Sequence, residues 1–174
     1  MTSTPSTNLE IWTATTSERQ AALEVTLEAY AEYERVLRPE YWDSYREHIV
    51  ETLTDLGAAE QLVAANGTLL LGTALFCPPG SSFGVPGEGM SPDCPEVRLV
   101  AVAPAGRGQG VGRALMEASV DRARSSGAPG LVLHTMAMMK AARSLYDSMG
   151  FERAPELDFQ PAKEWFVEGF RLDF

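Results

Sequence analysis

The residues best suited to chemistry form a glycine-rich turn that follows an apolar segment. Three glycines alternate with other residues in Gly108-x-Gly110-x-Gly112, soon after a β-branched run that ends at Pro104. Glycine permits backbone angles that bring a ligand close to the main chain. A helix that begins here presents unpaired N–H groups and the positive end of its dipole. The pattern therefore predicts a strand, a tight turn and a helix that bind an anion, and a pyrophosphate suits this site best.

Two common phosphate-binding motifs do not fit this spacing. The phosphate loop of nucleotide hydrolases has four residues between its glycines and then Lys and Ser or Thr, but no Lys follows Gly110 or Gly112. The dinucleotide fingerprint G-x-G-x-x-G would need Gly or Ala where the chain has Val111, Arg113 or Leu115. A dinucleotide-dependent enzyme is therefore nearly excluded.

The spacing that remains, Arg107-x-x-Gly110-x-Gly112 after a strand, resembles the acetyl-CoA signature R/Q-x-x-G-x-G/A of the GNAT superfamily of N-acetyltransferases. Residues 142–151 resemble the A-x-x-L-Y-x-x-x-G-F helix of the same family. The resemblance is firm over residues 96–151, about a third of the chain.

One position departs from the family pattern. The family often has Asn three residues before Ala142, and this chain has Met139. A hydrogen bond from that side chain to the cosubstrate is therefore lost.

The resemblance implies an α/β (α+β) fold with a mixed, splayed sheet of about seven strands flanked by about four helices. It implies acetyl-CoA as cosubstrate and no metal. The strand before the glycine turn would pair with pantetheine, and the turn would hold the pyrophosphate. The positions carried over are Val100, Ala101, Val102, Arg107, Gly108, Gln109, Gly110, Val111, Gly112, Arg113 and Ala142.

The resemblance also assigns two catalytic roles in the transfer of acetyl to a primary amine. Tyr146 matches the general acid that protonates the CoA sulfur, and a phenol is protonated at neutral pH. Glu96 matches a position from which several members draw a general base, acting directly or through water. Three other carboxylates compete for the role of base: Glu88 and Asp93 in the preceding loop, and Glu168 in the last strand.

Family members line the acceptor site with their first two helices and the loop before the motif strand. Here this region supplies aromatic side chains, including Tyr30 and Tyr33, among acidic ones. Aromatic rings with carboxylates suit a cationic amine. We therefore expect an amine acceptor, either a small molecule or a peptide or protein.

The charge of the chain argues against nucleic acid as a partner. The net charge is −10, but residues 98–143 hold seven basic and two acidic side chains, a local +5 that leaves −15 for the rest. The basic block coincides with the proposed pyrophosphate site. Arg107 and Arg113 bracket the glycine turn and are the best candidates for phosphate contact.

Length and composition predict one domain over residues 8–174 after a flexible polar tail at 1–7. Apolar runs are too short to cross a bilayer, and we expect a cytoplasmic protein with no secretory signal or membrane partner. Cys77 and Cys94 are interpreted as reduced thiols. The two histidines, His48 and His134, lack metal-site spacing, and His134 is interpreted as a strand residue rather than a catalyst. Homodimerisation is expected only as a tendency of the family.

The elements that position these residues follow from periodicity and from turn signals at Gly and Pro. Strands are predicted at 9–14, 61–65, 68–77, 96–103 and 131–135, with two antiparallel strands within 151–174; helices at 18–37, 41–56, 111–125 and 140–149; and a long loop at 78–95.

One alternative of a different class remains open. The chain could be a non-catalytic acyl-CoA-binding sensor or scaffold, an interpretation that the change to Met139 favours and that Tyr146 and Glu96 oppose. Replacement of Tyr146 by Phe would separate the two, because only an enzyme would lose turnover.

Overall fold

The computed structural model describes residues 8–85 and 87–174, and the chain divides into two compact units. Unit 1 comprises the described residues up to Leu75 together with Leu99–Met116, and unit 2 comprises Phe76–Arg98 and Glu117–Phe174. The expected flexible tail at 1–7 lies outside the described residues, and the single domain over 8–174 stays a prediction.

The described residues form a mixed, open sheet of eight strands with four α-helices, which confirms the predicted α/β class. The strand order is β1-β2-β3-β4-β5-β8-β6, and β7 pairs with β8. The strands are β1 (Leu9–Thr13), β2 (Glu60–Asn66), β3 (Leu69–Cys77), β4 (Glu96–Val102), β5 (Gly130–Thr135), β6 (Glu152–Arg153), β7 (Phe159–Ala162) and β8 (Trp165–Asp173). The helices are α1 (Arg19–Tyr30), α2 (Pro39–Thr54), α3 (Val111–Ser125) and α4 (Lys140–Ser148).

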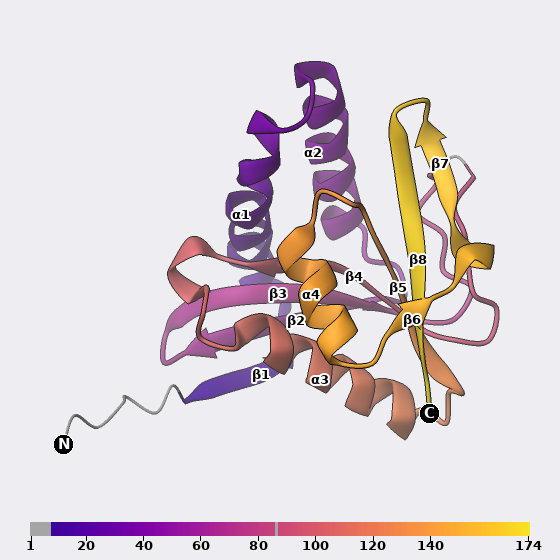
Figure 1. The fold of residues 1–174 in the computed structure, drawn as a ribbon. Helices are drawn as coiled ribbons and strands as arrows, with labels where there is room; N and C mark the ends of the chain where they lie inside the picture. The colour runs from indigo at the N-terminus through magenta and orange to yellow at the C-terminus, as the bar shows by residue number, and fades with distance from the viewer. Residues whose placement is uncertain (1–7, 86) are drawn as a thin grey trace. The chain divides into compact units, whose positions relative to one another are not determined.

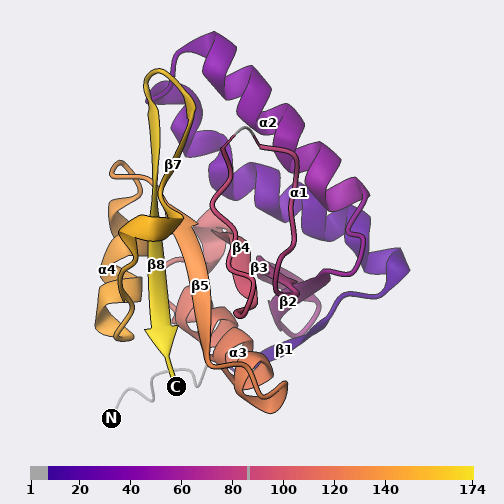
Figure 2. The same ribbon diagram turned by 90° about the vertical axis from the view of Figure 1, so that its right-hand side faces the viewer.

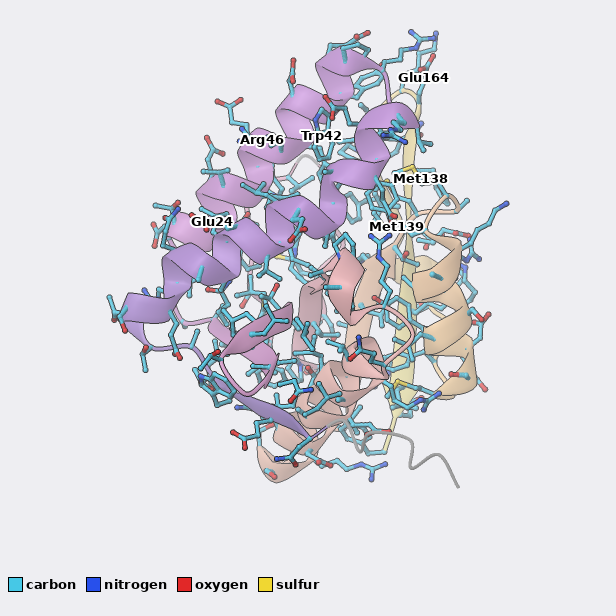
Figure 3. All side chains as sticks on the ribbon, turned by 90° about the vertical axis from the view of Figure 1, so that its left-hand side faces the viewer. Glu24, Trp42, Arg46, Met138, Met139 and Glu164 are labelled. Carbon is cyan, nitrogen blue, oxygen red and sulfur yellow. The ribbon has the colours of Figure 1, made fainter. Side chains whose placement is uncertain are left out.

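Unit 1 carries α1 and α2, which lie side by side in both ribbon views (Figure 1, Figure 2). The 3₁₀ turn that leads into α1 is capped by Thr15 and Glu18, and α2 begins at Pro39, where the fixed φ of proline suits a first helical position. Figure 3 labels Glu24 on α1 and Trp42 on α2: Glu24 is exposed, whereas Trp42 is buried.

The prediction of one continuous helix over residues 18–37 is wrong beyond Tyr30. The chain tightens there into a 3₁₀ turn, Ala31–Arg35, because the N–H of Val36 donates to the carbonyl of Tyr33 three residues earlier. This turn carries Tyr33 and Glu32, which belong to the candidate site.

Unit 2 is built on β8, which pairs antiparallel with β5, β6 and β7 (Figure 1). The parallel β4–β5 ladder joins Glu96 to Val132 and Val97 to Leu133. The loop at 78–95 has no helix or strand among its described residues, as predicted. No helix in the described part of the chain combines the length and apolar character that a bilayer crossing requires.

Candidate active site

The glycine turn joins β4 to α3 within unit 1. Gly108 and Gly110 have φ of +73° and +79°, in the left-handed region that suits glycine, and a Cβ at either position would meet open space. Helix α3 starts at Val111 as predicted. The first N–H groups of any α-helix precede its hydrogen-bond ladder, so a helix that begins directly after the turn can bind an anion at its N-terminus.

Close packing holds the start of α3 against the sheet. A Cβ on Gly72 of β3 would lie 2.7 Å from Cγ1 of Val111 and 2.8 Å from the carbonyl oxygen of Ala101. Only a glycine therefore lets α3 approach β3 and β4 so closely. The sequence analysis did not single out Gly72, because a lone glycine inside a strand has several explanations.

Leu99 in strand β4 has a φ of +47°, in the left-handed region of the backbone. A non-glycine residue in this region costs about 1–2 kcal/mol, and such strain persists where the surrounding structure holds it in place. Ala101 is buried, whereas Val100 and Val102 are half-buried. The pairing of pantetheine with the backbone at Val100–Val102 stays a prediction.

Arg107 contacts the helical region of unit 1. Its Nη2 lies 3.1 Å from Oε2 of Glu32 and donates to the carbonyl oxygen of Ala29 at 3.5 Å. The Tyr33 ring packs edge-on against Tyr30 with centroids 5.7 Å apart. Burial, together with the Glu32 carboxylate, raises the pKa of the Tyr33 phenol to about 12. The structure therefore brings one predicted phosphate-binding residue together with both predicted acceptor-site tyrosines.

Glu96 is a buried carboxylate in unit 2, with a side chain only 7% exposed. Its Oε1 lies 2.8 Å from Nδ1 of His134, and its Oε2 lies 3.8 Å from Nη1 of Arg98. The other ring nitrogen of His134 lies 2.9 Å from the carbonyl oxygen of Leu157. The interpretation of His134 as a mere strand residue missed this pair.

The loop before β4 is tied to the same cluster. The Arg98 guanidinium forms an ion pair with Glu88 and lies over the Phe83 ring, 4.3 Å from its centroid. Burial opposes ionisation of Glu88, but hydrogen bonds from the Phe83 N–H and Arg98 outweigh it and lower the pKa of Glu88. Burial also opposes the charge on Arg98, yet Glu96 and Glu88 raise its pKa. Glu88 is therefore a paired carboxylate, which makes it a poor candidate for a base.

The other two competing carboxylates have different surroundings. Glu168 accepts from Nη1 of Arg143 at 2.5 Å and lies 3.5 Å from Nε of Arg153. Asp93 is exposed in the loop. Of the four candidate bases, Glu96 alone is buried beside an imidazole.

Tyr146 is buried in α4, with its ring centroid 6.0 Å from that of Phe151. Helix α4 ends at a left-handed Gly150, after which the Phe151 N–H donates to the Tyr146 carbonyl. Ala142, half-buried, precedes Tyr146 by about one turn.

Met139 lies buried at the start of α4, where Figure 3 labels it beside Met138. The Thr135 hydroxyl donates to its sulfur at 3.6 Å. The residue that replaces the expected Asn is therefore a packing residue in unit 2. Among the described residues, no group of three or more His, Cys, Asp or Glu side chains could hold a metal ion.

Comparisons with known proteins identify the family of the chain. Residues 22–151 match the sequence profile of the Acetyltransferase (GNAT) family. A mycothiol acetyltransferase from Kocuria rhizophila is 43% identical over 68 residues, which cover 39% of this chain and 22% of the relative. The match thus spans about a fifth of that curated relative's length.

Solved structures share the fold. A GNAT-family acetyltransferase from Staphylococcus aureus superposes with a TM-score of 0.68 at 12% identity, over 95% of this chain and 98% of the other. A GNAT-family acetyltransferase from Brucella melitensis in complex with acetyl-CoA superposes with a TM-score of 0.61 at 20% identity. The alignment covers 97% of this chain and 89% of the other. The chain belongs to the GNAT family of acetyltransferases, whose cosubstrate is acetyl-CoA.

Proposed function

We propose that the protein transfers the acetyl group of acetyl-CoA directly to a primary amine. The observation that carries a catalytic role, rather than binding alone, is the buried Glu96 carboxylate at the start of the strand that leads to the glycine turn. A protein that only binds acyl-CoA needs no such group, because burying a carboxylate is costly even where it is paired, as Glu96 is with His134.

Each step of the reaction has a candidate residue. Glu96 takes a proton from the acceptor's ammonium, directly or through water, and the free amine attacks the thioester carbonyl. The carbon–sulfur bond then breaks, the electron pair stays on sulfur, and the Tyr146 phenol protonates the departing thiolate. The acetylated nitrogen loses its second proton to solvent, and the Tyr146 phenolate takes up a proton from solvent. The products are the N-acetyl amine and CoA.

The cosubstrate is held by the residues of unit 1. The backbone at Val100–Val102 pairs with pantetheine, and the N–H groups from Gly108 to Gly112 bind the pyrophosphate, with Gln109 and Val111 contributing their main chain. Arg107 and Arg113 supply positive charge for the phosphates. Positioning supplies much of the rate, since the thioester is already activated.

The acceptor is a cationic amine recognised on the first two helices. Tyr30 and Tyr33 offer ring faces, and Glu32 and its acidic neighbours offer negative charge. This chemistry suits a polyamine, an amino sugar or the amino group of a peptide or protein.

The test is amine-dependent release of CoA from acetyl-CoA with a panel of primary amines, with the product identified by mass spectrometry. We expect release with at least one class, and a loss of about 10²- to 10⁴-fold in kcat/KM for Glu96→Gln. Acetyl-CoA binding without amine-dependent release from any class would favour the sensor instead.

A further inference from the structure

Both ring nitrogens of His134 face hydrogen-bond acceptors. Nε2 lies 2.9 Å from the Leu157 carbonyl oxygen, which can only accept, so Nε2 carries a hydrogen. Nδ1 lies 2.8 Å from Oε1 of Glu96. A neutral imidazole has only one N–H, so a lone pair on Nδ1 would face a carboxylate oxygen without any hydrogen between them. One further proton therefore lies between His134 and Glu96.

The charges in this part of unit 2 lead to the same conclusion. The side chains of Glu88, Glu96 and Arg98 are 3%, 7% and 14% exposed. Two buried carboxylates thus share one guanidinium, and Glu88 holds it in a direct ion pair. The remaining negative charge needs a cation, and the His134 side chain, 9% exposed, is in hydrogen-bond contact with it.

The other groups around the pair do not supply that cation. Arg153 forms a two-point ion pair with Asp158, at 2.8 and 2.7 Å, and Asp158 is close enough to His134 for the two to interact electrostatically. Cys77 interacts with Glu96, and burial raises the pKa of its thiol, so it is neutral. The Phe159 ring packs edge-on against the imidazole with centroids 5.2 Å apart, which keeps water from that side.

We propose that His134 is a positioning residue that stores a proton for Glu96, so that the proton acceptor of the reaction is the Glu96–His134 pair. This inference rests on the proposed role of Glu96 as base. The Leu157 carbonyl fixes the Nε2–H, which leaves Nδ1 as the atom that gains and loses the proton.

The proton moves as follows. The pair releases its stored proton to solvent, which leaves a carboxylate opposite a neutral imidazole. An N–H bond of the acceptor's ammonium then breaks, its electron pair stays on nitrogen, and Glu96 receives the proton and shares it with Nδ1. The pair ends as carboxylate and imidazolium, the state that we infer from the two hydrogen-bond contacts of the His134 ring.

The direct test is the ¹⁵N NMR spectrum of histidine-labelled protein at neutral pH. The chain has two histidines, so His48→Gln assigns the signals. We expect both His134 nitrogens to have the shifts of protonated nitrogen. In Glu96→Gln the amide N–H donates to Nδ1, and the ring should become neutral with hydrogen on Nε2 only. A neutral His134 ring in the unmodified protein would overturn the proposal. This readout needs no turnover, so it decides the inference even if no amine is acetylated.

The pH profile of kcat/KM gives the second test. In His134→Asn an amide N–H can still donate to Glu96 but stores no proton. We expect kcat/KM to fall roughly ten- to a hundredfold, and the acidic limb of the profile to move to lower pH. His48→Asn is the matched control and should keep the original profile. An unchanged acidic limb in His134→Asn, with folding confirmed by thermal melting, would show that His134 has only a structural role.

Discussion

Arg107 and Glu32 provide the sharpest test of the anion site. In the structure the guanidinium is paired with the Glu32 carboxylate at 3.1 Å. A phosphate of acetyl-CoA bound at the glycine turn must compete with that carboxylate for Arg107. Removing the carboxylate by Glu32→Gln should therefore tighten acetyl-CoA binding, whereas removing the guanidinium should weaken it.

The expected changes in the Kd for acetyl-CoA follow from how far the Arg107 and Glu32 side chains are exposed to solvent. The two side chains are 46% and 48% exposed, so their ion pair contributes about 0.2–1 kcal/mol. Glu32→Gln should then lower the Kd by a factor of about 1.4 to 5. Arg107→Ala removes a hydrogen bond to a charged group, worth about 1.5–3 kcal/mol, and should raise the Kd roughly ten- to a hundredfold. Arg107→Glu should weaken binding further, because it adds repulsion.

The coupling between Glu32 and Arg107 is measured by calorimetric titration with acetyl-CoA. Four proteins are compared: the unmodified protein, Glu32→Gln, Arg107→Ala and the double variant. Glu32→Gln should have no effect once Arg107 is absent. Glu24→Gln is the matched control, because Glu24 is an exposed acid on α1 whose partner is Gln20, at 3.1 Å (Figure 3). Unchanged affinity in Arg107→Ala would refute the placement of the phosphate site.

Three further predictions concern unit 2. Gly89→Ala would put a Cβ 2.1 Å from the Leu157 carbonyl oxygen, so we expect a loss of about 1–3 kcal/mol in urea unfolding, and a stable variant would contradict this packing. Cys77 and Cys94 are buried and form no disulfide, so we expect a thiol reagent to react slowly with the folded protein and to label two thiols per chain in guanidinium; fast reaction of the native protein would contradict their burial. Hydrogen bonds from Arg153 lower the pKa of Asp158, so its stabilising effect is present above the ordinary carboxylate range and is lost as the pH falls through the lowered value. Asp158→Asn should therefore show a smaller loss of melting temperature between pH 5 and pH 2 than the unmodified protein, and equal losses would contradict the assignment.

The fold could be predicted where local signals are strong. Helix α3 matches its predicted range from Val111 to Ser125, because a glycine turn fixes its start and a clear apolar period follows. The strands predicted at 61–65 and 68–77 correspond to β2 and β3, and Gly67 between them has the positive φ typical of a tight turn. Strand β6 could not be predicted separately, because two residues are too few to show the alternation of apolar and polar side chains that marks a strand.

The site was only partly predictable for a different reason. Motif positions nominate Glu96 and Tyr146 as site residues, and the burial of Glu96 agrees with its place in an apolar strand. The contact of Glu96 with His134 joins residues 38 positions apart, and that of His134 with Leu157 spans 23. Such contacts depend on how strands are arranged in the sheet, which hydrophobic periodicity does not specify.

The most direct test of the central claim compares Tyr146→Phe with the unmodified protein, using acetyl-CoA affinity by calorimetry and amine-dependent CoA release side by side. If Tyr146 protonates the departing thiolate, the variant should bind acetyl-CoA with unchanged affinity and lose about 10²-fold or more in turnover. Undiminished turnover in the variant would contradict the proposed role of Tyr146. If neither protein released CoA with any amine although both bound acetyl-CoA, the claim that this chain is an N-acetyltransferase would be wrong.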